Sequence, residues 1–355
     1  MQVASDQPII AERPMYFTYD GAISGGHDAV GANSTSKQWY FAEGYTGSGF
    51  SEWICVLNPG DFPANLTFDF QTQEEGLVQR TRYAVPAHSR GSFKVNDVLG
   101  SDYQTSLKLS SDQPVVAERP MYFSYAHNVS AQGGHCVMGA PELADEYYFA
   151  EGTTRPSFDE WLTIQNPGAG PIEVQATYQL VEGDPVPKTY EVGAGARRTV
   201  YVPGEIGVDK DVSVHLTSES SFLAERPMYF NYSYADLSSD GGHCVIGATS
   251  ASTDWFLAEG FTGEGFNQWI CLQNAGEEDA MVTVTYYTQE AGALPPREMA
   301  VPAGTRQTIM VNGDAGAGYQ LSCGLSSTKP IVVERPMYFI CGGCPGGHDV
   351  VGYAH

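Results

Sequence analysis

Hydrophobic and polar side chains alternate along much of this chain. Leu66, Phe68 and Phe70 occupy every second position between polar neighbours, and the same alternation recurs at 174–178 and 282–286. Alternation of this kind buries one face of a β-strand and leaves the other face in water. An Asn-Pro-Gly or Asn-Ala-Gly turn sequence precedes each run, and the helical signal is negligible throughout. The pattern therefore predicts an all-β chain of short strands.

Longer stretches of the sequence also repeat. Trp53, Trp161 and Trp269 recur at an interval of 108 residues, which is too long for a solenoid coil and typical of one small sandwich domain per repeat. About seven strands fit into each repeat, which favours an immunoglobulin-like β-sandwich. The expected domains are residues 37–142, 143–250 and 251–355, preceded by residues 1–36 as the closing hairpin of an incomplete repeat.

One phrase occurs four times, although the rest of the repeat occurs three times. Glu-Arg-Pro-Met-Tyr-Phe begins at residues 12, 118, 225 and 334, and Gly-Gly-His follows each copy. We expect the strand that contains Leu107 and Leu109 to turn and to return as this phrase. The extra copy in residues 1–36 has three interpretations. The first is that the chain is a piece of a longer array. The second is that the hairpin packs on its own first domain. The third is that the hairpin completes a sheet in another molecule and builds a filament.

The acidic composition limits the classes of partner. A formal net charge of −24 argues against nucleic acid, because phosphate binding needs a basic surface. The acids are scattered, which is typical of a soluble, self-repelling surface. The sequence contains no run of eighteen apolar residues, so it predicts no membrane-spanning helix. The first residues do not resemble a signal peptide, so we expect any export signal to lie outside this chain.

Each Arg of the repeated phrase stands among apolar residues and needs a carboxylate partner. We expect that partner to be the Glu of the Ala-Glu-Gly sequence in the same repeat, because a guanidinium fork matches a carboxylate. The predicted pairs are Arg119 with Glu43, Arg226 with Glu151, and Arg335 with Glu259. This scheme leaves Arg13 without a partner in the chain. The catalytic alternative, in which Glu43 and Glu118 act as acid and base on a sugar, is disfavoured because it would repeat in every unit.

The Gly-Gly-His sequences invite a metal interpretation. Each contains a single His, followed by Asp or Cys, whereas zinc requires three or four ligands; a ligand set shared between adjacent repeats stays open. We favour a His whose ring bonds a backbone carbonyl beside a glycine turn, where the paired glycines allow positive φ or a close backbone approach. The histidines assigned to this turn are His27, His135, His243 and His348.

The aromatic and sulfur residues have structural interpretations. Trp53, Trp161 and Trp269 are expected to be core tryptophans, with an exposed platform for sugar stacking as the alternative. Seven cysteines leave at least one unpaired within the chain. Pairing within a repeat would join Cys55 to Cys136, pairing between repeats would join Cys244 to Cys271, and the pattern does not choose. A short clip from Cys341 to Cys344 is a further candidate disulfide.

The sequence contains no P-loop, dinucleotide fingerprint, Gly-x-Ser-x-Gly elbow or His-Glu-x-x-His motif. We therefore expect no enzyme activity and no cofactor. The combination of Phe-Ala-Glu-Gly, Trp-Ile-Cys-x-Leu-Asn, Val-Pro-Ala-x-Ser/Thr-Arg and Glu-Arg-Pro-Met-Tyr-Phe resembles an uncharacterised family of bacterial secreted or surface proteins, often actinobacterial, with tandem immunoglobulin-like repeats. The resemblance extends from Trp39 to Gly352 and carries no catalytic residue.

That resemblance implies an extracellular or cell-surface location and a structural or adhesive role. The expected partners are copies of the protein itself, adjoining repeats of a longer chain, or cell-wall and extracellular glycans. Two alternatives to a surface array stay open: a carbohydrate-binding accessory module, and a fibre subunit polymerised by strand or hairpin donation through residues 1–36.

Overall fold

The computed structural model describes residues 1–354. Strands account for 63% of the residues and helices for 4%, which confirms the all-β prediction. The helices are single turns that begin at a buried valine in each repeat, and no helix in the described residues is long and apolar enough to cross a membrane.

The strands form a short N-terminal hairpin and three larger units. The hairpin consists of β1 (Met15–Tyr19) and β2 (Ile23–His27). Unit 1 consists of β3 (Ser36–Phe41), β4 (Phe50–Asn58), β5 (Ala64–Thr72), β6 (Gly76–Val85), β7 (Ser89–Lys94), α1 (Val95–Leu99), β8 (Ser106–Ala126) and β9 (Ser130–Met138).

Units 2 and 3 repeat this order. Unit 2 consists of β10 (Ala144–Phe149), β11 (Phe158–Asn166), β12 (Ile172–Leu180), β13 (Val186–Val192), β14 (Ala196–Tyr201), α2 (Val202–Ile206), β15 (Val212–Tyr234) and β16 (Leu237–Ile246). Unit 3 consists of β17 (Ser252–Leu257), β18 (Phe266–Gln273), β19 (Ala280–Thr288), β20 (Gly292–Ala293), β21 (Arg297–Val301), β22 (Arg306–Met310), α3 (Val311–Asp314), β23 (Leu321–Glu334), β24 (Met337–Cys341), β25 (Cys344–His348) and β26 (Tyr353–Ala354).

One long strand joins the two layers of each sandwich. The first half of β8 pairs with β3 and β5, and its second half pairs with β4 and β9. The expected turn before the Glu-Arg-Pro phrase is therefore wrong, because the strand stays extended and changes partners near Asp112. The Asp112 carboxylate accepts the Asn65 N–H at 2.8 Å, which ties the crossing segment to the start of β5.

Each unit has its own hydrophobic core, and the buried tryptophans are not the predicted ones. Trp39 and Trp255 are each 1% exposed and donate their indole N–H groups to the carbonyls of Val115 and Ile331, both at 3.0 Å. Tyr147 is the corresponding buried aromatic residue in unit 2. The predicted core residues Trp53, Trp161 and Trp269 are only partly buried.

Those three tryptophans lie where a unit meets the neighbouring hairpin. Each donates its indole N–H to a hairpin tyrosine hydroxyl, at 3.0–3.2 Å. The accepting residues are Tyr19, Tyr125 and Tyr232, in that order. The three tryptophans were correctly predicted to lie on strands, but their side chains face the junctions between units and not the interior of one unit.

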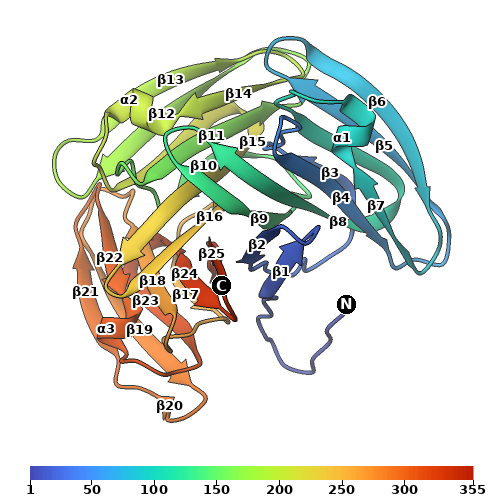
Figure 1. The fold of residues 1–355 in the computed structure, drawn as a ribbon. Helices are drawn as coiled ribbons and strands as arrows, with labels where there is room; N and C mark the ends of the chain where they lie inside the picture. Colours follow the sequence, from blue (N-terminus) through green and yellow to red (C-terminus); the bar gives the residue numbers. More distant parts are fainter. Residues whose placement is uncertain (355) are drawn as a thin grey trace.

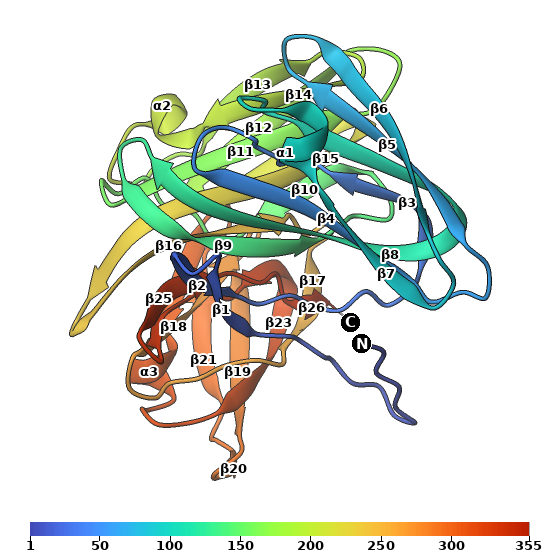
Figure 2. The ribbon, with the colours of Figure 1, turned by 45° about the vertical axis from the view of Figure 1, so that its right-hand side comes forward.

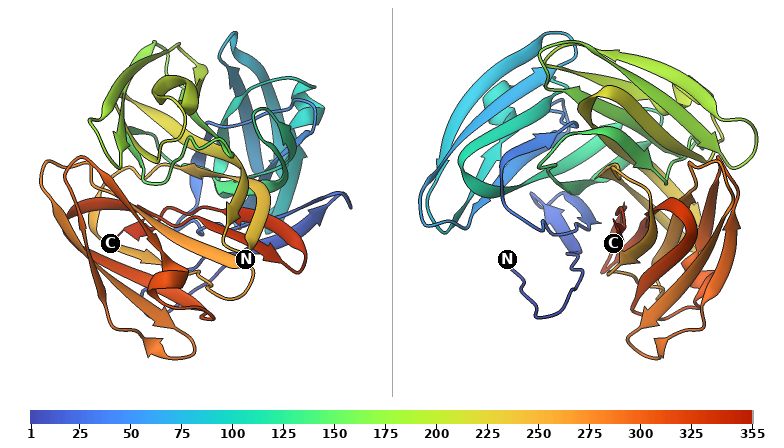
Figure 3. Two further views of the ribbon diagram at one scale, coloured as in Figure 1. Left: turned by 60° about the vertical axis from the view of Figure 1, so that its left-hand side comes forward. Right: turned by 180° about the vertical axis from the view of Figure 1, so that it is seen from behind.

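The three units curve around a centre that is formed by four hairpins (Figure 1 and Figure 3). The hairpin strands in the centre are β2, β9, β16 and β25, and each contacts the next around a closed circuit. The N-terminal hairpin is part of this circuit, between β9 and β25. Residues 15–27 are thus packed within their own molecule, and they contact the hairpins of units 1 and 3.

The Gly-Gly-His sequences lie within the central strands and not in turns, which corrects the turn assignment of their four histidines. The first glycines of the four copies face one another across the centre. A Cβ built on Gly241 would lie 3.3 Å from the Cα of Gly346, and one built on Gly133 would lie 3.4 Å from the Cα of Gly241. The paired glycines serve close backbone approach, one of the two roles expected for them; none of them has a positive φ.

Candidate functional site

The fixed polar residues gather where one unit meets the hairpin of the next. At each of these junctions, a buried Arg from one hairpin meets the Glu that begins the Glu-Arg-Pro phrase of the next hairpin around the central circuit. We refer to them by their arginines, as the Arg119, Arg226 and Arg335 sites. All three arginines are 0% exposed, so their charge must be balanced by protein groups.

The Arg226 site contains the largest set of carboxylates. Arg226 Nη1 lies 2.8 Å from Glu334 Oε2, and Nη2 lies 2.8 Å from Glu151 Oε2 and 2.5 Å from Asp349 Oδ2. Arg226 also donates to the backbone carbonyl of Glu151. The predicted pair of Arg226 with Glu151 is present, together with two carboxylates from unit 3 that the sequence interpretation missed.

The Arg119 site differs from the prediction. Arg119 Nη1 donates to the backbone carbonyl of Glu43 at 2.7 Å and to the carboxylate of Glu225 at 2.8 Å. The carboxylate of Glu43 instead accepts from Arg197 Nη2 at 3.1 Å. The predicted carboxylate pair is therefore wrong, because the chain places the Glu43 backbone, and not its side chain, beside Arg119.

The Arg335 site is completed by the N-terminal hairpin. Arg335 contacts Glu12 at 2.9 Å and Asp28 at 2.7 Å, and it donates to the backbone carbonyl of Glu259. The carboxylate of Glu259 is not its ion-pair partner, so this predicted pair is also wrong. Arg13, for which no partner was expected, lies 3.3 Å from Glu118.

These contacts form a closed circuit of Arg-to-Glu pairs. The order is Arg13 to Glu118, Arg119 to Glu225, Arg226 to Glu334 and Arg335 to Glu12. Adjacent residues of a strand face opposite sides, so the Glu and Arg of one phrase point to different neighbours. This alternation was visible in the sequence and could have shown that each phrase binds two partners.

The same Glu residues also accept backbone N–H groups from the unit that contributes the Arg. The N–H of Ala42 donates to Glu225 Oε1 at 2.7 Å, that of Ala150 to Glu334 Oε1 at 3.0 Å, and that of Ala258 to Glu12 Oε1 at 2.8 Å. The Ala-Glu-Gly sequence thus contributes its backbone at all three sites, which explains why the segment recurs with small flanking residues.

Burial and the neighbouring charges together set the protonation of these groups. Burial alone would lower the pKa of Arg226, but Glu334, Glu151 and Asp349 together raise it well above its ordinary value. Burial and the nearby Glu334 raise the pKa of Asp349 well above its usual range, against the opposing effect of Arg226. At the Arg335 site, burial raises the pKa of Glu12 to about 7, although Arg335 opposes the change.

A further buried carboxyl accompanies two of the sites. Burial raises the pKa of Glu52 to about 8 and that of Glu160 well above its usual range, against the opposing charges of Arg119 and Arg226 respectively. Unit 3 has Gln268 at the corresponding position, where the side-chain oxygen accepts the Phe261 N–H at 2.9 Å. The neutral amide in unit 3 matches the protonated state that burial favours for Glu52 and Glu160.

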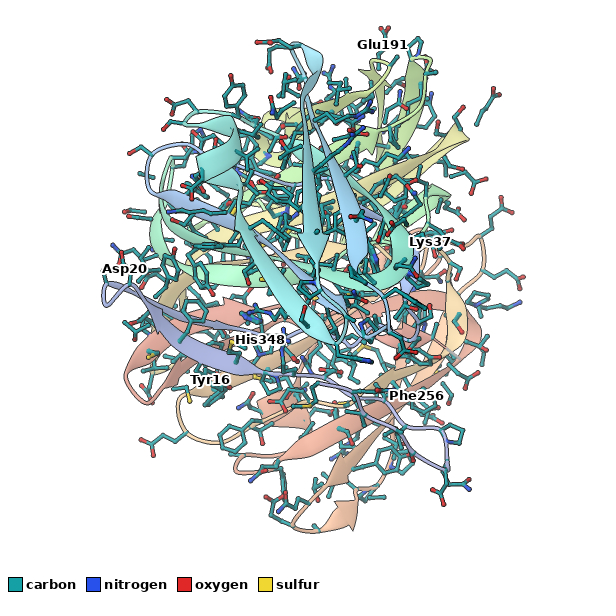
Figure 4. The ribbon with its side chains drawn as sticks, turned by 90° about the vertical axis from the view of Figure 1, so that its right-hand side faces the viewer. Tyr16, Asp20, Lys37, Glu191, Phe256 and His348 are labelled. Carbon is teal, nitrogen blue, oxygen red and sulfur yellow. The ribbon has the colours of Figure 1, made fainter. Side chains whose placement is uncertain are left out.

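The four hairpin histidines are buried and do not make the predicted bond to a carbonyl. Within residues 1–354, neither ring nitrogen of His135, His243 or His348 has a hydrogen-bond partner, and the same is true of Nδ1 of His27. Burial lowers the pKa of His27 to about 4 and that of His348 to about 3. Each ring packs against a Phe of its own hairpin, such as Phe339 beside His348, and Figure 4 shows His348 in the packed interior.

One set of groups has the composition of a metal site. Glu151, His243 and Asp349 have ligand atoms that all lie within 4.8 Å of one another. They come from adjacent units, as a shared ligand set would require. The guanidinium of Arg226 bridges the two carboxylates, so a protein cation already balances this set.

All seven cysteines are free thiols. Cys55 and Cys136 lie in unit 1 without a bond between them, and Cys341 and Cys344 face each other across the β24–β25 hairpin. Cys244 and Cys271, the pair expected from an inter-repeat disulfide, also remain separate. Cys244 instead contacts the carboxylate of Glu225 at 3.2 Å, at the position that Asp349 occupies in unit 3.

Comparisons with known proteins give little further guidance. No family model matches the chain, and no curated protein matches it. Among solved structures, the Anabaena sensory rhodopsin transducer is 29% identical over 24% of this chain and 95% of its own, with a TM-score of 0.22. Thermotoga maritima 1070 is 15% identical over 30% of this chain and 96% of its own, with a TM-score of 0.28.

Proposed function

We propose that this chain is a non-enzymatic structural or adhesive repeat protein of an extracellular or cell-surface array. The observation that carries this proposal is the burial of Arg119, Arg226 and Arg335 between units. The recurring charged residues are engaged in joining one unit to the next, and a substrate has no access to them. Their role is to hold three sandwiches in a fixed arrangement.

Localisation and assembly on the source cells test this proposal. Antibodies against the purified chain should label intact cells, and electron microscopy should show the label on the outer surface or on a surface array. Labelling that requires permeabilised cells would contradict the extracellular role. Hydrolysis of a cell-wall polysaccharide by the purified chain, abolished by Glu151→Gln, would contradict the non-enzymatic role.

Binding of an extracellular glycan is a second candidate, favoured by one groove. This groove of about 520 Å³ contains the aromatic residues Tyr16, Phe261 and Tyr287 beside the amides of Gln289 and Gln320. Aromatic faces with adjacent amides suit the apolar faces and hydroxyl groups of sugars. A glycan array should detect a ligand for the wild-type chain and lose it for Tyr287→Ala, since Tyr287 is exposed. The exposed Met281→Ala serves as the control.

Fibre assembly by donation of residues 1–36 is the remaining alternative. The N-terminal hairpin contacts β9 and β25 of its own chain, so donation to another molecule would have to open the Arg335 site. Deletion of residues 1–36 tests this alternative, because a fibre that still assembles without them cannot depend on hairpin donation.

A further inference from the structure

Three repeat bodies surround the four central hairpins. We define a repeat body as the part of a unit before its Glu-Arg-Pro phrase, such as residues 36–117 of unit 1. Bodies lie beside the hairpins that begin with Glu118, Glu225 and Glu334, and the hairpin that begins with Glu12 has no body of its own in the described residues. Figures 1 and 2 show this fourth position as the open side where the N-terminal segment runs.

The side chains at the fourth position match those of the filled sites but are uncovered. We call this position the open site and define it by Arg13, Arg90 and Glu118. The side chain of Arg13 is 40% exposed, whereas its three counterparts are 0% exposed. Arg90 is exposed as well, whereas its counterparts Arg197 and Arg306 are buried.

The counterparts of Arg90 show what it would bind. Arg197 of unit 2 donates to the backbone carbonyl of Gly44 at 2.9 Å, and Arg306 of unit 3 donates to that of Gly152 at 2.8 Å. Both carbonyls belong to the Ala-Glu-Gly sequence of the preceding body. Arg306 also donates to the sulfur of Cys271 at 3.1 Å. Among the described residues, Arg90 makes the equivalent bond to Cys55 at 3.0 Å but has no backbone carbonyl of a preceding body to bind.

The first hairpin also has an unpaired strand edge. Among the described strands, β1 pairs with β2 alone, whereas the Glu-Arg-Pro strands of units 1, 2 and 3 pair on both sides. Met15 on β1 is 40% exposed, although Met121, Met228 and Met337 are each 0% exposed. An unpaired edge of this kind is a template for strand addition.

A groove of about 590 Å³ runs along this position. Its walls include Arg13, Arg90, Glu118, Cys55 and Leu57, and the N-terminal segment with Ile9 and Ile10 forms one side. The groove therefore combines two arginines, the carboxylates of Glu12 and Glu118, and apolar side chains. Two arginines and the Glu of a Glu-Arg-Pro phrase likewise contact a body at the Arg119 and Arg226 sites.

We propose that the open site binds a fourth repeat body through its Phe-Ala-Glu-Gly segment. The N–H groups of Ala and Glu would donate to Glu118, and the Glu carbonyl would accept from Arg13. The Gly carbonyl and the Glu carboxylate would accept from Arg90, as Gly44 and Glu43 accept from Arg197. The strand that follows would pair with β1, with its Phe opposite Phe17, as Phe50 lies opposite Phe123.

The occupant is a repeat body whose Ala-Glu-Gly backbone is not already bound by the Glu and Arg residues of other hairpins. In this chain the Ala-Glu-Gly backbones at Ala42, Ala150 and Ala258 are bound by Glu225, Glu334 and Glu12. A second copy of this molecule would have to break one of these sites before it could fill the open one. The proposal does not depend on the adhesive role, because it concerns only the complementarity of repeat body and hairpin.

A fusion that adds one body tests the proposal. Residues Ser5-Asp6-Gln7-Pro8 correspond to Ser111-Asp112-Gln113-Pro114, so a second copy of residues 36–110 joined directly to Ser5 restores the natural register. Hydrogen exchange of the β1 amides should slow by at least about tenfold, because the open edge becomes paired. The same fusion with Arg13→Ala and Glu118→Gln should lose most of this protection. A folded added body that leaves β1 exchange unchanged overturns the proposal.

If the added body in the fusion does not fold, a peptide titration tests binding at the open site instead. The probe is a fluorescent peptide of residues 38–56, titrated with the full 355-residue chain. We expect saturable binding that Arg13→Ala and Glu118→Gln each weaken by about tenfold, the usual effect of losing a charge-assisted hydrogen bond. Methylation of the peptide nitrogen at Ala42 should have the same effect. The exposed Arg80→Ala serves as the control, and equal binding by all variants, or no saturable binding, overturns the proposal.

Discussion

Arg226 has two carboxylate partners in unit 3 and one in unit 2, and its side chain is fully buried. A buried charge with several partners is stable only as a complete set, because removal of one member leaves the others without compensation. The same chemistry joins every pair of neighbouring units, so the behaviour of single residues at these sites decides how the units hold together.

Replacement of Arg226 by Ala should therefore destabilise the junction of units 2 and 3. We expect a loss of about 3–5 kcal/mol in the free energy of unfolding, since Glu151, Glu334 and Asp349 are left buried and unpaired. Urea denaturation of the variant and the wild type measures the difference. The control is Arg155→Ala, because Arg155 forms an exposed pair with Asp211 and should cost less than about 1 kcal/mol. Equal losses for the two variants would contradict a buried ion cluster.

The buried carboxyl of Glu52 predicts a pH dependence. Its pKa is raised from 4.5 to about 8 by burial, so between these values the folded protein keeps a proton that the unfolded chain releases. The contribution of Glu52 to stability is therefore complete below pH 4.5 and falls as the pH rises to 8. Glu52→Gln should remove this loss and should be more stable than the wild type at pH 8.5, by about 1–3 kcal/mol.

Thermal unfolding at pH 5 and at pH 8.5 measures this effect. The two proteins should differ more at the higher pH, and the exposed Glu182→Gln should follow the wild type at both values. Unit 3 carries Gln268 at the same position, which indicates that the fold accepts the amide. A Glu52→Gln variant with the same pH dependence as the wild type would show that Glu52 is ionised in the folded protein.

The sequence identified the charged residues of the junctions but only one of the predicted ion pairs, that of Arg226 with Glu151. The regular recurrence of Glu43, Arg119 and their counterparts is visible in any alignment of the repeats. Which carboxylate meets which Arg depends on the angle between successive units, and that angle is set by packing between hairpins far apart in the chain. For the same reason, the histidines could be predicted as fixed but not as buried and without hydrogen bonds.

At the scale of strands, the alternation of apolar residues predicted most elements. It did not predict that β8 and β15 continue through the polar segment before the Glu-Arg-Pro phrase. A segment such as Ser-Asp-Gln-Pro resembles a turn, yet it is the point at which one strand leaves the first layer and enters the second. Local propensity has no information about this change of partners, which is decided by contacts with β4 and β5.

The contact of the central hairpins predicts the effect of a single methyl group. A Cβ on Gly242 would lie 2.8 Å from the carbonyl oxygen of Met228 and 2.9 Å from the ring of Phe123. Gly242→Ala should therefore lower the free energy of unfolding by about 1–3 kcal/mol through overpacking. Gly170→Ala is the matched control, because a Cβ there meets nothing within 4 Å, and chemical denaturation compares the two. Similar stability of both variants would mean that the hairpins are less closely packed than the distances indicate.

At the scale of the whole molecule, the sequence showed four hairpins and three repeat bodies but not their closed arrangement. Stacked tyrosines join three of the hairpin pairs, Tyr19 with Tyr122, Tyr125 with Tyr229, and Tyr232 with Tyr338, at centroid distances of 3.8–3.9 Å. The fourth junction has Cys341 at the corresponding position. A circuit of this kind couples the first residues of the chain to the last unit, over a sequence distance that no local pattern can report.

Deletion of residues 1–35 should consequently destabilise unit 3, which lies at the other end of the sequence. The deletion removes Glu12 and Asp28, the two carboxylates that hold Arg335, and it frees the N–H of Ala258 from its acceptor. Hydrogen exchange should accelerate in β18 and β24, which flank Arg335, and should change little in β5 and β6 of unit 1. Glu12→Gln combined with Asp28→Asn should reproduce most of the effect, because the hairpin then stays in place without its charges. If exchange in unit 3 were unaffected by the deletion, the N-terminal hairpin would be a passive neighbour, and Arg335 would have to be stabilised by unit 3 alone.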